Sequence, residues 1–179
     1  MSKKLIGLVG RARVGKDTSA TYLADKYRLL PYAFALPVKE MLEPVFGDLF
    51  YSGDREQPIE WLGKSPRQLM QTLGTDWGRD LIHPDLWVLL AHQQWKKFPG
   101  SAGMVATDVR FSNEAEWVLR EGGTLIEIVR PGAELVNSHS SEQADLSHLC
   151  DYRIENTGTI EQLHENLDRV VTLINGATY

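Results

Sequence analysis

The sequence predicts an α/β fold with a doubly wound, mostly parallel sheet flanked by helices. Short apolar segments alternate with longer segments of helical period, as in chains that form βαβ units. The first apolar segment passes directly into a glycine-containing loop and then into a helical pattern. With 179 residues, 42% of them hydrophobic and 24% charged, the chain has the size and composition of one soluble domain.

Short apolar runs mark the expected strands. Strands buried on both faces of a parallel sheet are continuously apolar, and the run Leu5-Ile6-Gly7-Leu8-Val9 fits that description. In chain order, we expect strands at residues 5–9, 32–35, 104–107, 124–129 and 152–154.

Capping residues and prolines mark the expected helices. Ser65 followed by Pro66 predicts an N-cap and a first-turn proline for a helix that runs to about Gly74. Two other starts have the spacing of a capping box, Asn113 with Glu116 and Thr159 with Gln162. We expect helices that begin at Lys16, Pro37, Ser65, Pro84, Asn113 and Thr159. The second covers residues 37–46, with Pro44 weakening its end, and Gly176 closes the last. Residues 47–64 and 131–141 are expected to be loops.

Composition excludes several classes of protein. The chain has 19 Lys and Arg against 24 Asp and Glu, a net charge of −5, which disfavours a nucleic acid polymer as partner. Cys150 is the single cysteine, so no internal disulfide forms, and no N-terminal apolar run is long enough for a signal peptide or a membrane span. The histidines lack metal-ligand spacing. We expect a cytoplasmic protein without a membrane partner, and the oligomeric state, including a homodimer, stays open.

Residues 10–18 have the pattern of a phosphate-binding loop, Gly10-Arg11-Ala12-Arg13-Val14-Gly15-Lys16-Asp17-Thr18. Glycines let successive N–H groups face one anion, the following helix adds its positive end, and the lysine reaches the β- and γ-phosphates. The alternative is a chance glycine turn, which the preceding strand and following helix disfavour. We therefore expect a nucleotide to bind at Arg11, Arg13, Val14, Gly15, Lys16, Asp17 and Thr18.

Three side chains are candidate Mg²⁺ ligands. Asp17 stands where such loops usually carry a Ser or Thr whose hydroxyl binds the metal, and Thr18 follows it. Which of the two contacts the metal is open, and the alternative for Asp17 is a carboxylate that only stabilises the helix start. Asp108 ends an apolar strand, as expected of the second magnesium-organising segment, and Arg110 follows at the same strand end.

Arg67 and Gln71 are four residues apart and therefore share one face of the helix that begins at Ser65. An arginine suits bidentate binding of a phosphate, and a glutamine amide can recognise the edge of a base. From this segment alone, a solvated helix face is the better explanation.

Taken together, the motifs resemble the bacteriophage deoxynucleoside monophosphate kinases, which have the P-loop NTPase fold. The resemblance spans about residues 5–171 and includes the Gly15-Lys16-Asp17-Thr18 loop. The chain looks short for that family, and we expect residues 47–64 to replace a longer insertion. The motifs that carry the resemblance, in order, are the phosphate loop, Arg-Gln-Leu-Met-Gln-Thr-Leu-Gly-Thr-Asp from Arg67, Asp-Leu-Trp-Val from Asp85, Thr-Asp-Val-Arg-Phe-Ser-Asn-Glu from Thr107, Ile-Val-Arg-Pro-Gly from Ile128 and Asn-Thr-Gly-Thr from Asn156.

The resemblance implies Mg²⁺-dependent transfer of the γ-phosphoryl of ATP to a deoxynucleoside monophosphate, in the host cytoplasm if the chain is phage-encoded. It implies catalytic roles for Lys16, Asp108 and Arg110 within one domain, residues 1–179. A helical region at about residues 37–99 would bind the acceptor through Lys39, Arg67, Gln71, Trp87, Arg110 and Glu114.

A lid-like loop is expected at about residues 130–145. In it, Arg130 either touches the donor phosphates or caps a strand end. His139 either touches a ligand or is a solvated loop histidine, and the second is the better explanation. Two other functions stay open: another small P-loop metabolite kinase, such as a dephospho-coenzyme A kinase, and a nucleotide-gated switch. No clear base-reading or water-positioning motif supports the switch.

Overall fold

A computed structural model describes residues 3–51, 54–97, 103–133 and 145–176. The chain forms two compact units, and each is described by itself. The larger unit consists of Met1–Ala33 with Trp95–Tyr179, and the smaller one is Phe34–Gln94. The range of the smaller unit lies close to that of the predicted helical region.

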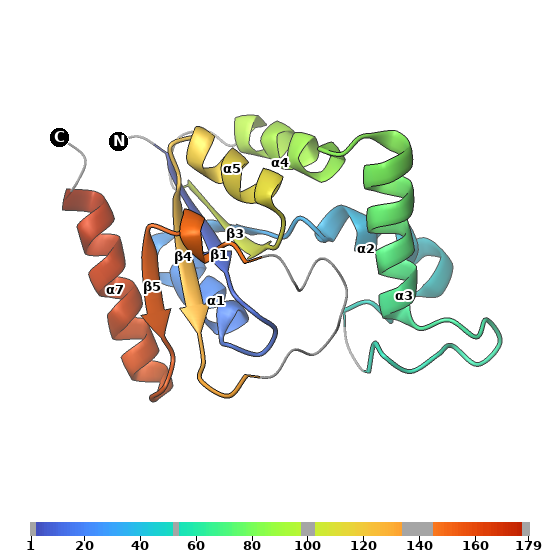
Figure 1. The fold of residues 1–179 in the computed structure, drawn as a ribbon, viewed down its shortest axis with the longest axis horizontal. Coiled ribbons are helices and arrows are strands. Elements are labelled where there is room, and N and C mark those ends of the chain that lie inside the picture. The colour runs from blue at the N-terminus through green and yellow to red at the C-terminus, as the bar shows by residue number, and fades with distance from the viewer. Residues whose placement is uncertain (1–2, 52–53, 98–102, 134–144, 177–179) are drawn as a thin grey trace. The chain divides into compact units, whose positions relative to one another are not determined.

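The larger unit holds a five-stranded parallel sheet in the order β2-β3-β1-β4-β5 (Figure 1). Successive strands are added on one side of β1 and then on the other, so β1 lies between β3 and β4. Ligands of open α/β sheets bind at the carboxyl ends of strands where the order reverses in this way. The strands are β1 (Lys4–Val9), β2 (Leu30–Tyr32), β3 (Gly103–Val109), β4 (Thr124–Val129) and β5 (Tyr152–Glu155).

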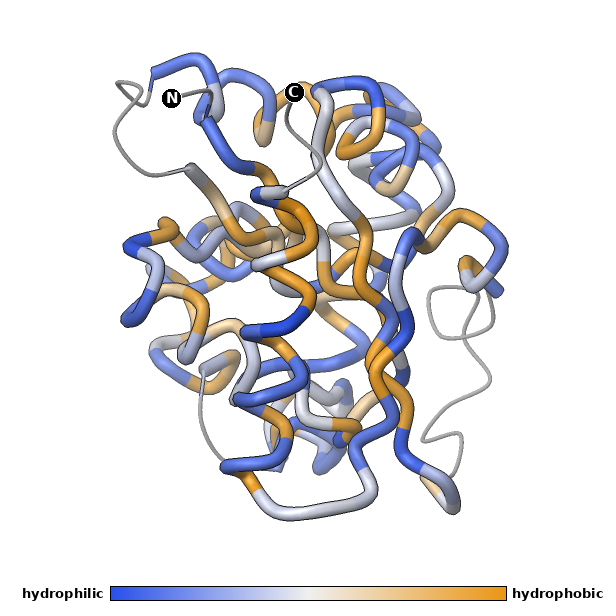
Figure 2. Tube along the Cα trace, turned by 90° about the vertical axis from the view of Figure 1, so that its left-hand side faces the viewer, coloured by the Kyte–Doolittle hydropathy of each residue, from blue (hydrophilic) through white to orange (hydrophobic). Residues whose placement is uncertain are grey.

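Helices cover both faces of this sheet, as predicted. Ile6 and Leu8 belong to a buried cluster with Leu23 and Leu167, from the helices on one face. Gly7 points to the opposite face, where a Cβ would lie 3.2 Å from the Val118 side chain. Figure 2 shows the resulting band of hydrophobic residues along the strands. The helices are α1 (Lys16–Tyr27) and α7 (Ile160–Gly176) on the first face and α5 (Ser112–Arg120) on the second, with a short helix η2 (Ser147–Leu149) before β5.

The smaller unit is helical, apart from its loop. Ser65 caps the second helix as predicted: its hydroxyl accepts the Gln68 N–H at 3.2 Å, and the Gln68 side chain accepts the Ser65 N–H at 3.0 Å. Residues 47–64 form the expected loop where they are described, closed by a bridge between Ile59 and Lys64. The helices are α2 (Leu36–Phe46), α3 (Pro66–Gln71), η1 (Thr72–Ile82) and α4 (Leu86–Lys97), whose last turn from Trp95 belongs to the larger unit.

The helix that begins after Ser65 does not end near Gly74, contrary to the prediction. It continues into the π-helix η1. The Trp87 indole N–H donates to the Gly74 carbonyl at 2.7 Å, and a Cβ on Gly78 would lie 2.4 Å from the Trp87 ring. Gly78 therefore leaves room for the tryptophan ring, and neither glycine ends the helix.

Two other predicted boundaries were wrong. The second strand occupies Leu30–Tyr32, earlier than expected, because Pro31 is compatible with an edge strand. The capping carboxylate of α5 is Glu114, which accepts the Phe111 N–H at 3.1 Å, whereas Glu116 is exposed. The Thr159 and Gln162 box is confirmed, with bonds of 3.3 and 2.9 Å. Among the described residues, no helix combines the length and apolar character needed to cross a membrane.

Candidate active site

The predicted phosphate loop follows β1 directly and curls back on itself. Gly10, Arg13 and Gly15 have φ values of 144°, 63° and 106°. A Cβ on Gly10 would lie 2.3 Å from the Ile128 carbonyl oxygen, so this position excludes every residue but glycine. A chain that curls through positive φ values gathers its N–H groups on the concave side, which is how such loops bind anions.

Lys16 is the first residue of α1 and is only 7% exposed. Its Nζ donates hydrogen bonds to the carbonyls of Gly10 and Arg11, at 2.7 and 2.5 Å. The ammonium group is therefore held against the loop itself. Asp17 and Thr18 are exposed on the first turn of α1, where the positive end of the helix dipole lies. Anionic oxygens are stabilised at such a helix start.

Asn156 holds the loop from the C-terminal part of the chain. It follows β5 and is 5% exposed, and its Nδ2 donates to the Val14 carbonyl at 2.8 Å. A Cβ on Gly15 would lie 2.5 Å from that nitrogen. The carbonyl of Asn156 in turn accepts the Nε–H of Arg130 at 3.2 Å. Arg130 thus caps a strand end, which is one of its two predicted roles. Its side chain is otherwise exposed, and contact with the donor phosphates, the other role, stays a prediction.

Asp108 and Arg110 lie at the end of the strand that pairs with β1. Val9, the last residue before the loop, is opposite Val109. The register shifts between Gly7 and Val9, so β3 has one more residue than β1 in this stretch. Such bulges redirect side chains and are common next to active sites. Asp108 and Arg110 flank Val109 and are both half-buried, so they share a sheet edge with the phosphate loop.

Glu114 fixes the backbone of this strand end. Its side chain is 2% exposed, and its Oε2 accepts the N–H of Arg110 at 2.8 Å and that of Phe111 at 3.1 Å. A carboxylate that accepts backbone N–H groups at a helix start is a strong cap. In the structure, Glu114 therefore positions Arg110, and direct contact with an acceptor stays a prediction.

The other predicted acceptor residues belong to the smaller unit. Arg67, on α3, forms an ion pair with Glu56 and is half-buried, as is Gln71 one turn later. Lys39 of α2 lies 5.4 Å from the centre of the Tyr51 ring. Trp87 is 2% exposed and packs against η1, so its contribution is to support that helix.

The predicted lid falls largely outside the described residues. Residues 134–144, with His139, are not described. Arg11 lies beside the residues that lead into that segment, and its Nη1 donates to the Ala133 carbonyl at 3.4 Å. Burial raises the pKa of the Cys150 thiol to about 12, which keeps it protonated and unreactive.

The sequence profile of the family described as deoxynucleotide monophosphate kinase matches residues 4–59 and 61–167 of this chain. The chain belongs to this kinase family. The predicted resemblance is thereby confirmed, and among the three hypotheses the match selects the nucleotide kinase over the metabolite kinase and the switch. Its members are phosphotransferases that take ATP as donor and small nucleotides as substrates.

Viral relatives support this assignment. A mimivirus protein, whose name assigns it provisionally to these kinases, is 34% identical, with 91% of this chain and 93% of the relative covered. The deoxynucleotide monophosphate kinase of Escherichia phage RB69 is 25% identical over 242 positions, covering 94% of this chain and 99% of the relative. That alignment is longer than this chain, so the phage enzyme has additional residues, as expected. The mimivirus protein aligns over 182 positions and is of similar size.

Solved structures support the fold alone. The shikimate kinase of Aquifex aeolicus has a TM-score of 0.55 at 13% identity, with 97% of this chain and 98% of that chain covered. The shikimate kinase of Bacteroides thetaiotaomicron has a TM-score of 0.54 at 14% identity, with 96% and 98% covered. The P-loop kinase fold predicted from the sequence is confirmed.

Proposed function

We propose that this kinase transfers the γ-phosphoryl group of ATP to the 5′-phosphate of a deoxynucleoside monophosphate, forming ADP and the deoxynucleoside diphosphate. The observation that carries the proposal is the buried Lys16 ammonium inside a curled glycine loop, in a chain of the deoxynucleotide monophosphate kinase family. Two polyanionic substrates must meet in this reaction, so fixed cations and N–H groups are its main requirement.

The phosphate loop would bind the donor. Its N–H groups and the N-terminus of α1 offer hydrogen bonds to the β- and γ-phosphates, and the Lys16 ammonium would exchange its loop carbonyls for phosphate oxygens. Arg11, Arg13 and Arg130 are exposed beside the loop and would add positive charge from the solvent side. Val14 and Gly15 contribute through the backbone.

Asp17, Thr18 and Asp108 fit a Mg²⁺ ion that is held mainly by phosphates. Magnesium in kinases keeps several waters and takes only one or two protein oxygens, which these side chains supply at one sheet edge. Within the described residues, no group of three or more His, Cys, Asp or Glu forms an all-protein metal cage. When bound, the ion would neutralise charge on the transferred phosphoryl group.

The acceptor would be bound by arginines. We assign its phosphate to Arg110 of the larger unit. Arg67, Lys39 and Gln71 of the smaller unit stay predictions that the family resemblance implies. Glu114 and Trp87 act through the segments that they position, because both are buried and bonded to backbone groups.

In the transfer step, an oxygen of the acceptor phosphate attacks the γ-phosphorus while the bond to the β–γ bridging oxygen breaks. The electron pair of that bond stays with ADP, and the new bond completes the diphosphate. Lys16 and Arg110 would stabilise the charge that spreads over the transferred group. Water must be excluded, since it would compete as the nucleophile.

The direct test incubates the protein with ATP, Mg²⁺ and each of the four deoxynucleoside monophosphates in turn. Formation of ADP and of the matching diphosphate is followed by chromatography, with a control that lacks acceptor. We expect acceptor-dependent formation of both products with at least one base. If ADP formation stays at the acceptor-free background with all four, the proposed function is wrong.

A further inference from the structure

We propose that Asn156 is a positioning residue that sets the phosphate loop in its anion-binding shape. The inference rests on the proposed function, because it concerns the loop that would bind the donor phosphates. Asn156 opens the Asn-Thr-Gly-Thr motif after β5, to which the proposed reaction assigns no role. It is nevertheless one of the few buried polar side chains in the described part of the chain.

The hydrogen bond from Asn156 fixes the orientation of one peptide plane. In a trans peptide, the carbonyl of Val14 and the N–H of Gly15 point in opposite directions. Because Asn156 Nδ2 holds the Val14 carbonyl at 2.8 Å, the Gly15 N–H is directed away from Asn156. A rotated peptide would present a carbonyl dipole to the phosphates where an N–H group is needed.

Gly15 and Asn156 fit together closely. A Cβ on Gly15 would lie 2.5 Å from Nδ2, so the side chain occupies the space that any other residue would need. Asn156 is itself held at both backbone groups: its N–H donates to the Val129 carbonyl at 2.8 Å and its carbonyl accepts from Arg130. The amide is thus anchored to the sheet, and the loop is shaped against it.

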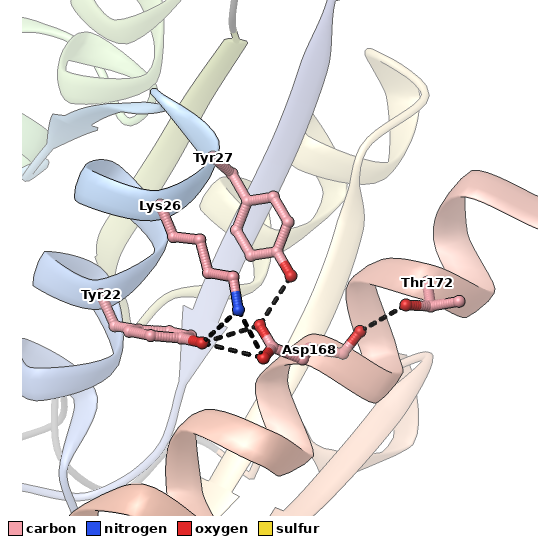
Figure 3. Close-up of polar contacts among 5 residues, drawn as sticks. All are labelled: Tyr22, Lys26, Tyr27, Asp168 and Thr172. Carbon is pink, nitrogen blue, oxygen red and sulfur yellow. Dashed lines mark hydrogen bonds and ion pairs between the residues drawn. The ribbon is translucent and has the colours of Figure 1, made fainter.

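A contact between α1 and α7, the helices that follow these two segments, supplies the matched control. Further along α1 and α7, the Asp168 carboxylate accepts hydrogen bonds from Tyr22, Lys26 and Tyr27 (Figure 3). This cluster joins α1 to α7 and contains no group of the phosphate loop. Asp168→Asn should therefore destabilise the fold without changing the loop.

The experiment measures ADP binding by calorimetry, together with thermal unfolding, for the wild type, Asn156→Ala, Asp168→Asn and Asn166→Ala. Asn166 is a second asparagine, on α7, bonded only to Arg169 within the described residues. We expect Asn156→Ala to weaken ADP binding by about tenfold or more, since it leaves the Val14 carbonyl unpaired and the peptide free to rotate. Asn166→Ala and Asp168→Asn should keep ADP affinity within about twofold, whatever their unfolding temperatures.

At saturating ATP, the KM for the acceptor should be unchanged in Asn156→Ala, because the acceptor does not touch this loop in the proposed reaction. If Asn156→Ala does not fold, Asn156→Ser, which replaces the Nδ2 donor by a hydroxyl on a shorter side chain, is judged by the same measurements. Wild-type ADP affinity in the folded variant, or equal weakening by Asp168→Asn, would overturn the proposal. A wild type that binds ADP but phosphorylates no acceptor refutes the proposed function alone, and a wild type that binds no ADP refutes both.

Discussion

The Tyr27 hydroxyl donates a 2.6 Å hydrogen bond to the Asp168 carboxylate, which joins the end of α1 to the middle of α7. Tyr22 donates to the same carboxylate at 2.8 Å, and Lys26 forms an ion pair with it at 2.7 Å. The His164 ring stacks on Tyr22 with centroids 3.8 Å apart. A single carboxylate thus organises the contact between two helices on one face of the sheet.

Asp168→Asn should lower the free energy of unfolding at neutral pH by about 1–2 kcal/mol, because a charged acceptor of several hydrogen bonds becomes neutral. Burial alone would raise the pKa of Asp168, but the hydrogen bonds from Lys26, Tyr27 and Tyr22 outweigh it and lower that pKa below 3.8. The stabilisation is therefore present above pH 3.8 and is lost as the pH falls through the lowered pKa. Urea unfolding at stepwise lower pH should show the two proteins converging, with Asp25→Asn, an exposed site on α1, as control.

Tyr27→Phe should change the alkaline stability profile. Burial, and then the bond to Asp168, raise the pKa of Tyr27 from 10.0 to about 12. A raised pKa stabilises the fold below pH 10 and loses that contribution as the pH rises toward 12, because the unfolded chain releases its proton first. The wild type should therefore lose stability more steeply over this range than Tyr27→Phe. Parallel profiles in denaturant titrations would contradict this.

Lys16→Ala should reduce phosphoryl transfer by about a thousandfold, since it removes the buried cation that we assign to the transferred phosphoryl group. Circular dichroism should show the fold retained. Lys97→Ala, at the exposed end of α4, serves as the control for loss of one lysine and should keep full activity. Near-normal transfer by Lys16→Ala would refute the assignment of the phosphate loop.

Arg110→Ala should raise the KM for the deoxynucleoside monophosphate far more than the KM for ATP, because we assign this arginine to the acceptor phosphate. Initial rates with each substrate varied in turn measure the two constants. Equal effects on both would place Arg110 on the donor side of the reaction. Arg120→Ala, at the exposed end of α5, is the matched control and should change neither constant.

Gly78→Ala should destabilise the protein by about 1–3 kcal/mol, because the added methyl group would meet the Trp87 ring. Gly74→Ala is the control in the same helix, since its Cβ would lie 3.7 Å from Val38, an ordinary contact distance. Thermal unfolding of the two variants should differ clearly. A similar midpoint for both would show that the tryptophan is not packed as described.

Features set by neighbouring residues could be predicted from the sequence. The curl of the phosphate loop depends on its own glycines, and the Ser65 cap on a partner three residues away. The role of Asn156 could not be predicted in this way, because its partner Val14 lies 142 residues away in the sequence. A single asparagine after a strand does not indicate which group it bonds. Gly74 was wrongly predicted to end its helix for a similar reason, since only the fold shows the Trp87 indole N–H that donates to its carbonyl.

The acceptor residues show a second limit of the sequence. Arg67 and Gln71 were correctly expected on one helix, because the four-residue spacing requires it. The spacing of Arg110 and Glu114 did not reveal that the carboxylate holds the arginine's own backbone N–H. Whether a charged side chain contacts a substrate or supports the backbone depends on its burial. The neighbouring sequence does not indicate whether a charged residue is buried.

The contacts of Asn156 with Val14 and of Asp168 with Tyr22 bear on how the protein is made. They join residues 142 and 146 positions apart, at opposite ends of the chain. During synthesis, α1 and the loop before it leave the ribosome long before their partners exist, and such distant contacts form late. We expect the nascent chain to gain nucleotide affinity only when its last helix has been released.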